Sequence, residues 1–411
     1  MFFPLIILAV INTVFAFNFK DILIKKPYEI VFDTTTTTKK AVHVDQLDQR
    51  CPLEFGSSSL QTGCRCNFNT STIECIYSDR LDTIPPFYQT EAAINWNVNL
   101  KCKNFSFLSN FRPFLPLDKI NVLDLSSSLD PSTECKNAEN SSLLKLSRLG
   151  HQVTNTNKKS LKIEQINLEN NNLKSINLIN NTSYELKINS LKLSNNSLES
   201  LDIKTHLDLC YLEMESLDAS NNQLKRIEIG FLIFLTRLNL SQNHLTSFLV
   251  DFYNSQEFRL YHARSCHFAN TTNLHSSLIN LDASINFLSI LPFKILDTQY
   301  SDLIFLNLSQ NRLREIRNYE FSSMGMLERL DLSHNLIVQV FNKSLSGLKS
   351  LHYLDLSDNR VSQIPAGMFK EQKEILQILN LNRNSLSQVP QEAFKFLGHL
   401  KCLHLCQNQI K

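Results

Sequence analysis

A repeating pattern constrains this chain more than any other feature. From about residue 120 onward the sequence follows L-x-x-L-x-L-x-x-N-x-L, with Ile, Val, Met, Phe or Ala at some Leu positions. Clear copies are LIFLNLSQNRL at 303–313, LERLDLSHNLI at 327–337 and LHYLDLSDNRV at 351–361. Self-similarity at a fixed period of roughly 20–50 residues indicates a stack of like units. The pattern therefore predicts one solenoid, not the roughly two to four domains that 411 residues would otherwise suggest.

The ninth position of the pattern, which we call the slot, recurs at intervals of 20–26 residues. It falls at residues 171, 196, 222, 243, 266, 286, 311, 335, 359, 384 and 408. In the copy FRLYHARSCHF at 258–268, Cys266 takes the slot, as a buried substitute for Asn that such patterns allow. Ser128 takes it in the copy at 120–130, and 43 residues separate Ser128 from Asn171. That interval contains either a degraded copy around LLKLSRL or an insertion.

The pattern also predicts local structure. Its L-x-L segment alternates apolar and polar residues, which predicts a short strand with the apolar side chains inward. Each unit returns the chain to the same side, so successive strands run parallel. The chain turns inward at the slot, where an Asn amide can both donate to and accept from backbone groups. One unit buries too few apolar side chains to offset its ordering entropy, so neighbours must share a core.

A second apolar position follows each slot by about ten residues and predicts a row that fills the opposite, convex side. Its members are Tyr253, Leu296, Phe321, Leu345, Phe369 and Phe394. Helices should be few and short.

These copies resemble the leucine-rich repeat family, in the 24-residue form common in animal extracellular proteins. The resemblance covers roughly residues 51–411. It implies an α/β-type leucine-rich repeat solenoid, a curved horseshoe with a parallel concave β-sheet and one short strand per repeat. About 13–14 repeats would occupy 87–411.

The start of the chain indicates secretion. Residues 1–16, MFFPLIILAVINTVFA, form an apolar run too short to span a bilayer and end in a small-residue cleavage pattern, as in a signal peptide. The alternative is an uncleaved anchor. Residues 17–50 contain a Thr run and form a linker, either O-glycosylated or an ordinary disordered spacer. Ten Asn-x-Ser/Thr glycosylation sequons lie at Asn69, Asn104, Asn140, Asn180, Asn181, Asn195, Asn239, Asn270, Asn307 and Asn342.

Four cysteines precede the repeats, in CPLEFGSSSLQTGCRCNFNTSTIEC at 51–75. Four cysteines allow three disulfide pairings. A zinc site is the alternative, which secretion and the lack of a nearby His pair disfavour. The spacing resembles the N-terminal cysteine cap of secreted leucine-rich repeat proteins, at 51–86. That resemblance implies the pairs Cys51–Cys66 and Cys64–Cys75. A cap covers the apolar edge of the first unit.

The other cysteines are less orderly. Cys102 and Cys135 lie on adjacent early units, which leaves their pairing open, and Cys210 has no partner that the pattern identifies. Cys402 and Cys406 are four apart along a strand, about 13 Å, too far for a mutual disulfide.

The sequence stops at Lys411 with no cysteine cap after the last slot. Either a longer protein continues beyond this point or a partner covers the last unit, and we expect truncation. The family resemblance implies that a longer form would continue with repeats, a cap and a membrane anchor.

No catalytic motif or metal-ligand spacing is present, so we expect neither an enzyme nor a bound cofactor or metal. His262, His334 and His404 fall on distant units, too far apart to share one ion. The Asp282, Asp331 and Asp355 column belongs to the repeat pattern itself. The formal charge of +2 gives no general argument for nucleic acid or an anionic membrane.

Function must then come from an exposed face, and the concave sheet offers rigid, evenly spaced side chains. The outward position just before the second Leu of each copy holds four notable residues, Phe305, Arg329, Tyr353 and Ile378. Aromatic side chains beside an Arg are typical of protein-binding hot spots. We therefore predict a partner contact centred on this row. The alternative is drift at weakly constrained surface positions, and a glycan at Asn307 would crowd the row.

The resemblance implies an extracellular or cell-surface protein that mediates recognition or adhesion through its concave face, as in chaoptin-like and Slit-like proteins. Its partner would be an extracellular protein ligand or a cell-surface receptor. One alternative is a fragment of a Toll-like receptor ectodomain, a family that also has a transmembrane helix and a signalling domain, both absent from this sequence. Another is a secreted enzyme inhibitor.

Overall fold

The computed structural model divides the chain into two compact units, Met1–Asp48 and Gln49–Lys411. It describes residues 64–67, 72–76, 96–101, 119–126, 143–145, 160–177, 185–202, 214–228, 235–247, 278–291, 300–395 and 397–411. All of these lie in the second unit. The expected signal peptide at 1–16, the linker at 17–50 and most of the cysteine cap at 51–86 lie outside the described residues.

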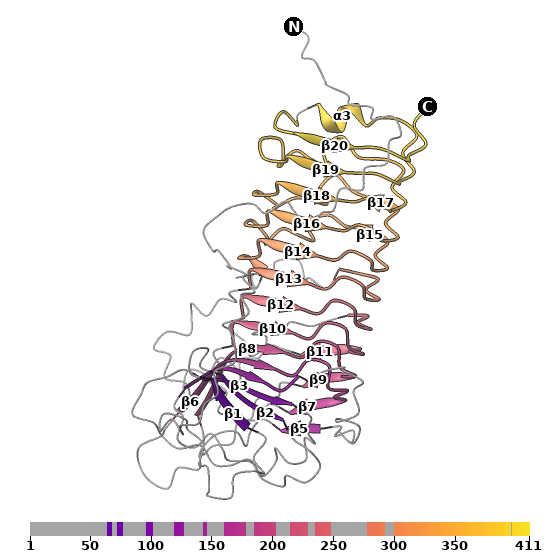
Figure 1. Ribbon diagram of the computed structural model, residues 1–411. Coiled ribbons are helices and arrows are strands. Elements are labelled where there is room, and N and C mark those ends of the chain that lie inside the picture. The colour runs from indigo at the N-terminus through magenta and orange to yellow at the C-terminus, as the bar shows by residue number, and fades with distance from the viewer. Residues whose placement is uncertain are drawn as a thin grey trace, which may run out of the picture. The chain divides into compact units, whose positions relative to one another are not determined.

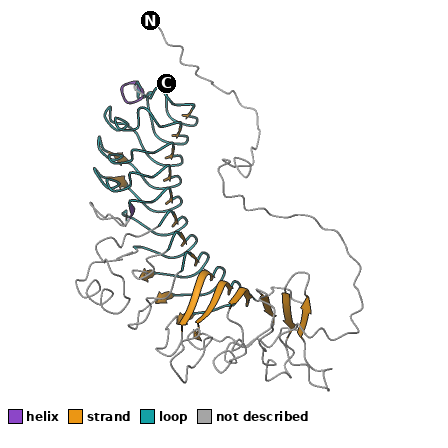
Figure 2. Cartoon of the chain, turned by 90° about the vertical axis from the view of Figure 1, so that its left-hand side faces the viewer, coloured by secondary structure: helices purple, strands orange, loops and turns teal. Residues whose placement is uncertain are grey.

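One long sheet organises the second unit (Figure 1). Its fourteen strands follow the order β1 (Cys64–Asn67), β2 (Thr72–Ile76), β3 (Trp96–Lys101), β4 (Lys119–Asp124), β6 (Ser160–Asn167), β8 (Glu185–Lys192), β10 (Ser216–Asp218), β12 (Arg237–Asn239), β13 (Asn280–Asp282), β14 (Phe305–Asn307), β16 (Arg329–Asp331), β18 (Tyr353–Asp355), β19 (Ile378–Asn380) and β20 (Cys402–His404). β1 and β2 pair antiparallel, and every later pair is parallel. The predicted parallel solenoid with one short strand per coil is confirmed, and Figure 2 shows these strands on the inner side of the bend.

Further strands lie on the segments that lead from one strand of the main sheet to the next, which we call the return paths. β5 (Leu143–Lys145), β7 (Ser175–Asn177), β9 (Ser200–Asp202) and β11 (Arg226–Glu228) form a four-stranded sheet. β15 (Glu315–Ile316) pairs with β17 (Gln339–Val340). Within the described residues the one helix is α3 (Gln391–Phe394), and no helix there is long and apolar enough to cross a membrane. Few short helices were expected, and the described part agrees.

Inward leucines form the core between sheet and return path. Leu306, Leu330, Leu354 and Leu379, from four consecutive strands, are fully buried. On the convex side Phe321, Leu345 and Phe369 are buried as the second apolar position predicts, and the Phe394 ring centroid lies 6.0 Å from that of Phe369. Tyr253 and Leu296 of that row lie outside the described residues.

The slot asparagines join consecutive coils. Asn335 donates from Nδ2 to the carbonyls of Leu308 in the preceding coil and Leu332 in its own, both at 3.0 Å. Its Oδ1 accepts from the backbone N–H of Leu313, one coil earlier, at 3.1 Å. The same set of bonds recurs at Asn196, Asn222, Asn243, Asn286, Asn311, Asn359, Asn384 and Asn408. This ladder satisfies buried backbone groups that no sheet bond reaches.

In the main sheet, β13 follows β12 directly, although the sequence pattern places the slot of Cys266 between them. β12 pairs directly with β13, and Asn286 donates to Leu240 O while accepting from Leu245 N. These are the bonds that each slot makes with the coil immediately before it, so no coil lies between them. The prediction that the copy at 258–268 adds a strand between them was therefore wrong, and Cys266 itself lies outside the described residues.

The 43-residue interval after Ser128 is an insertion. β4 pairs directly with β6, and Asn171 Nδ2 donates to Leu125 O at 2.9 Å. The LLK of LLKLSRL is β5, which pairs with β7 in the four-stranded sheet and not with the main sheet. Two coils of the stack are therefore long. Asn286 makes every bond of the ladder across the second, and Asn171 keeps the bond to the preceding coil across the first.

Candidate protein-interaction face

The structure places the four predicted contact residues side by side. Phe305 of β14 pairs with Arg329 of β16, Arg329 with Tyr353 of β18, and Tyr353 with Ile378 of β19. Each strand has a buried central Leu, and the position after it is half-buried except at Asp355 of β18, which is buried. Arg329 is exposed and the other three side chains are half-buried. We call these four residues the central row.

A stacked pair stiffens the middle of the central row. The Arg329 guanidinium carbon lies 4.7 Å from the centroid of the Tyr353 ring, within the range of a cation–π contact. The Tyr353 hydroxyl donates to Asp355 Oδ2 at 3.1 Å. Burial, and then the neighbouring Asp355 carboxylate, raise the pKa of the Tyr353 phenol above its ordinary value. The phenol therefore remains a neutral donor, and the pair presents a flat, preorganised surface.

The next outward position along each strand carries Asp or Asn with a structural task. In most coils the side-chain oxygen accepts from the backbone N–H two residues on, as Asp331 does from Ser333 at 2.9 Å. Cross-strand bonds join Asn307 Nδ2 to Asp282 Oδ2 and Asn380 Nδ2 to Asp355 Oδ2. These bonds support the interpretation of the acidic column as part of the repeat.

Asp331 lacks such a cross-strand amide. Burial raises the pKa of Asp331 above its ordinary value, Ser333 opposes the shift by hydrogen bonding, and the charges of Asp355 and Asp282 add to it. The carboxylate is therefore held at some electrostatic cost in the middle of the sheet.

The sequons differ in how the fold engages them. Asn307 and Asn239 are half-buried and close the turn after their strands by accepting from Ser309 and Ser241. Asn195 and Asn342 are exposed. The other six lie outside the described residues: Asn69, Asn104, Asn140, Asn180, Asn181 and Asn270. Both amide atoms of Asn307 are hydrogen-bonded beside the central row.

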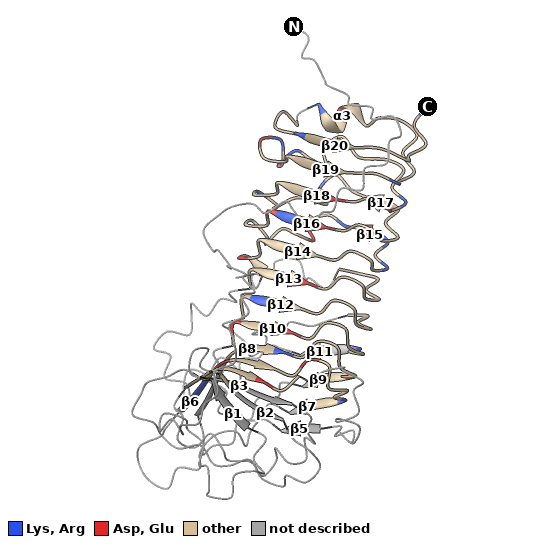
Figure 3. Cartoon of the chain, viewed as in Figure 1, with Lys and Arg blue, Asp and Glu red and all other residues tan. Residues whose placement is uncertain are grey.

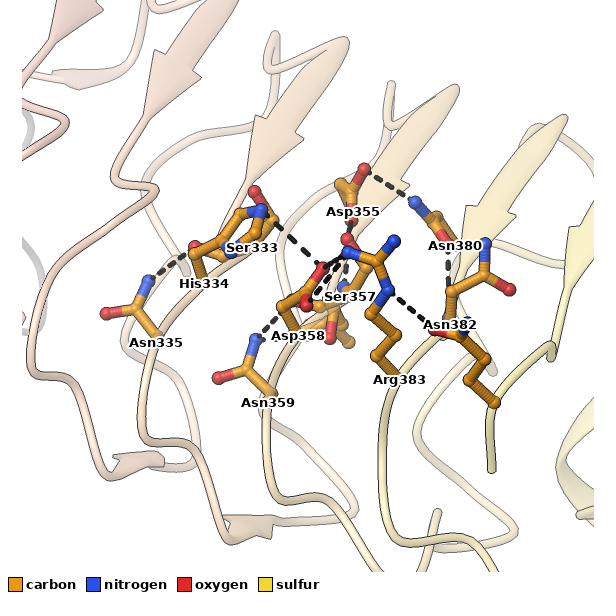
Figure 4. A network of polar contacts seen from close by, with 12 residues as sticks. Ser333, His334, Asn335, Asp355, Ser357, Asp358, Asn359, Asn380, Asn382 and Arg383 are labelled. Carbon is orange, nitrogen blue, oxygen red and sulfur yellow. Dashed lines mark hydrogen bonds and ion pairs between the residues drawn. The ribbon is translucent and has the colours of Figure 1, made fainter. Parts of the chain in front are cut away.

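Sequence reasoning missed a second row at the turns. The residue just before each slot has a positive φ, and this row contains Asn170, Asn195, Asn221, Gln242, Ile285, Gln310, His334, Asp358, Arg383 and Gln407. Asp358 lies between His334 and Arg383 (Figure 4), with ion-pair distances of 3.5 Å and 3.2 Å. Arg383 Nε also donates to Gln407 at 2.7 Å. The signal was available, since this position is polar in every slot-bearing copy but one.

No metal site emerges where the chain is described, since no cluster of three His, Cys, Asp or Glu residues is placed to hold an ion there. His334 is held by Asp358, His404 is exposed on β20, and His262 lies outside the described residues.

Only some of the cysteines lie within the described residues. Backbone register sets Cys64 of β1 opposite Cys75 of β2, whereas Cys51 lies outside the described residues. Cys402 and Cys406 are exposed free thiols, with Cys406 in the turn after β20 and not on the strand as expected. Cys102, Cys135 and Cys210 lie outside the described residues.

A comparison with protein-family models agrees with the repeats described above. The leucine rich repeat family model matches residues 301–361 and 374–411. A solved leucine-rich repeat protein of Leptospira interrogans aligns with 76% of this chain and 91% of that chain, at 22% identity and a TM-score of 0.41. No curated protein matches the sequence. Leucine-rich repeats generally serve as scaffolds for protein–protein interaction. The chain thus carries leucine-rich repeats, and the coils stacked around the matched segments form a leucine-rich repeat solenoid.

Proposed function

We propose that this chain is an extracellular or cell-surface recognition protein that binds a protein partner through the concave face of its main sheet. The contact is centred on the central row of Phe305, Arg329, Tyr353 and Ile378. The observation that carries this proposal is the adjacency of these residues on four consecutive strands, with Arg329 stacked on Tyr353.

The row has the properties of a hot spot. Tyr and Arg are enriched among residues that dominate binding energy, and side chains already fixed in place lose little entropy on association. At the same position, most earlier strands carry polar side chains, such as Gln165, Ser190 and Ser216. Among the described strands, the aromatic side chains at this position are therefore confined to one segment of the face.

Extracellular location is supported by the sequence. The apolar segment at 1–16, the ten sequons and the cysteine spacing at 51–75 are all typical of secreted proteins. Expression of the full chain in cultured animal cells tests this part. We expect glycosylated protein in the medium or at the cell surface, and retention in the cytosol without glycans would contradict it.

The binding proposal is tested by screening the purified full chain against a panel of extracellular domains and then comparing variants on the partner identified. We expect Phe305→Ala with Tyr353→Ala to reduce affinity by about a hundredfold, since two hot-spot side chains are removed. Ser190→Ala with Ser216→Ala, at matched positions on β8 and β10, should leave affinity unchanged. Equal affinity of the first pair and the wild type, with equal thermal stability, would refute the central row as the contact.

A further inference from the structure

A second exposed cluster lies on the turns after the strands and is not used by the proposed concave contact. In the described part of the chain, three of the seven exposed large apolar side chains belong to the single coil at 278–291. They are Ile285, Phe287 and Ile290, with exposed fractions of 38%, 37% and 62%. At equivalent positions the adjacent coils carry polar residues such as Gln310, Arg312 and Glu315. An apolar patch with a polar rim is typical of an interaction site.

The Phe287 ring is held between neighbours. Its centroid lies 5.5 Å from that of His244 in a stacked arrangement, and the Arg312 guanidinium carbon lies 4.2 Å from it. Three successive coils therefore contribute one side chain each to a His–Phe–Arg stack. Because both neighbours restrain the ring, Phe287 presents a fixed edge to solvent and would lose little rotamer freedom on binding.

Basic side chains border the apolar cluster. Arg312 and Arg314, on the coil after this cluster, are exposed, and neither forms an ion pair with a residue that the structure describes. The nearby carboxylates are engaged elsewhere: Glu315 with Arg317, and Asp358 with Arg383. Figure 3 shows blue segments along the edge beside β15 and β17.

The apolar and basic residues interleave along this edge. Val338, 53% exposed, follows Arg314 by one coil, and its backbone N–H donates to Arg314 O at 2.9 Å. We call Ile285, Phe287, Ile290, Arg312, Arg314 and Val338 the turn-edge patch. It spans three consecutive coils, whose strands are about 4.8 Å apart, so it is about 10 Å long at the backbone.

We propose that the turn-edge patch is a second docking surface, and that its occupant is an acidic polypeptide segment with apolar side chains. Arg312 and Arg314, which have no ion-pair partner among the described residues, provide the charge complementarity for carboxylates, and they increase the association rate of an anionic partner. A sulfated polysaccharide would use the arginines but leave the rigid Phe287 edge and Val338 without a partner. The interleaving therefore favours a protein segment over a purely anionic ligand.

Fluorescence anisotropy on the purified full chain tests this with synthetic peptides of about 15 residues. The first alternates Glu or Asp with Leu, the second replaces Leu with Ser, and the third replaces the acidic residues with Lys. We expect measurable binding of the first alone, weakening as salt is raised. Equal binding of the Ser peptide would overturn the proposal, and so would heparin or phosphatidylserine vesicles binding while the first peptide does not.

Variants locate the site. Arg312→Glu with Arg314→Glu should weaken the first peptide by about tenfold or more, and Ile290→Asn with Val338→Asn by about fivefold or more. Arg329→Glu, on the concave face, should leave peptide binding unchanged, so the two surfaces can fail independently. Thermal melts confirm that each variant is folded. Loss of binding only in Arg329→Glu would assign the peptide to the concave face and overturn the proposal.

Discussion

The stack has two kinds of region, and they differ in the paths that return the chain between strands. From residue 300 onward the slots Asn311, Asn335, Asn359, Asn384 and Asn408 are 24 or 25 residues apart. Between residues 119 and 291, two coils have 43 residues, as the register of Asp124 with Asn167 and of Asn239 with Asp282 requires. The slot geometry nevertheless stays the same. The Asn286 amide donates to Leu240 O, 46 residues earlier in the chain, at 2.9 Å. The Asn311 amide donates to Ala283 O, 28 residues earlier, at 3.0 Å.

The comparison teaches that strand and turn are specified by the pattern, while the length of the return path is not. An added loop costs only slowly increasing closure entropy, about 0.6 kcal/mol for each doubling of length. The Asn ladder and the inward leucines contribute the same bonds and the same buried surface in both regions. Stacking therefore tolerates insertions wherever they leave the strand and its slot unchanged.

The ladder gives the largest expected effect. Asn335→Ala removes the donor to Leu308 O and Leu332 O and the acceptor of Leu313 N–H, leaving buried groups unpaired. We expect a loss of roughly 3–5 kcal/mol in unfolding free energy, measured by urea denaturation followed by circular dichroism.

Asn286→Ala, whose bonds close a 43-residue coil, should cost the same within about 1 kcal/mol if the two regions are equivalent at the slot. Asn408→Ala serves as the control, because that side chain is only half-buried and its loss should cost less. A much smaller effect at Asn286 than at Asn335 would show that the long coil is not truly stacked.

Gly347 marks a point in the regular region where the backbone of one return path packs closely against that of the preceding coil. It has φ of +96°, and an added Cβ would lie 2.5 Å from Ser322 Cα and 2.6 Å from Ser322 O in the preceding coil. Gly347→Ala should therefore cost about 2–4 kcal/mol and lower the thermal midpoint. Gly325→Ala is the matched control, since its Cβ would meet nothing closer than 3.9 Å. Equal midpoints for the two variants would contradict the close approach.

Much of the fold was predictable because strands and slots repeat the same residues at the same spacing. The wrong prediction at 258–268 arose because a 43-residue coil divides into intervals of 23 and 20 that fit the period by chance. The warning signs in that copy were the missing Asn, with Cys266 in the slot, and an apolar Leu260 at an outward position.

The side-chain rows were only half predictable. Position within the pattern placed Phe305 and Tyr353 correctly beside Arg329, because register follows from the period. Which ring the guanidinium stacks on depends on rotamers and burial, which no spacing encodes. The stack of His244, Phe287 and Arg312 was missed for a related reason. The pattern predicted a repeat between His244 and Phe287, whereas the two residues lie on consecutive coils.

Ile285, on the coil that follows the second insertion, offers a smaller effect in the opposite direction. It adopts φ of 54°, a left-handed conformation that a β-branched residue rarely takes, whereas its counterparts include Asn, Gln, His, Asp and Arg. Ile285→Asn should stabilise the protein by about 1 kcal/mol, seen as a higher thermal midpoint. Gln310→Asn, in the regular region, should change the midpoint much less. A lower midpoint for the Ile285 variant would show that its apolar contacts outweigh the backbone strain.

The acidic positions of the sheet give the smallest effect. Asn239, Asp282 and Asn307 alternate amide and acid on successive strands, and Asn307 donates to Asp282, whereas Asp331 and Asp355 lie opposite each other on the next two strands. Because burial and then nearby carboxylates keep the pKa of Asp331 raised, the folded protein binds a proton there more tightly than the unfolded chain does. This residue therefore contributes stability that falls as pH rises through the unfolded and then the folded pKa. Asp331→Asn keeps an oxygen for the Ser333 N–H, removes that penalty, and should stabilise the protein by about 0.5–1 kcal/mol at neutral pH but not at pH 3. Since the substitution creates an Asn-x-Ser sequon, the comparison needs unglycosylated protein. A gain of the same size at both pH values would show that packing, and not the charge of Asp331, accounts for the gain.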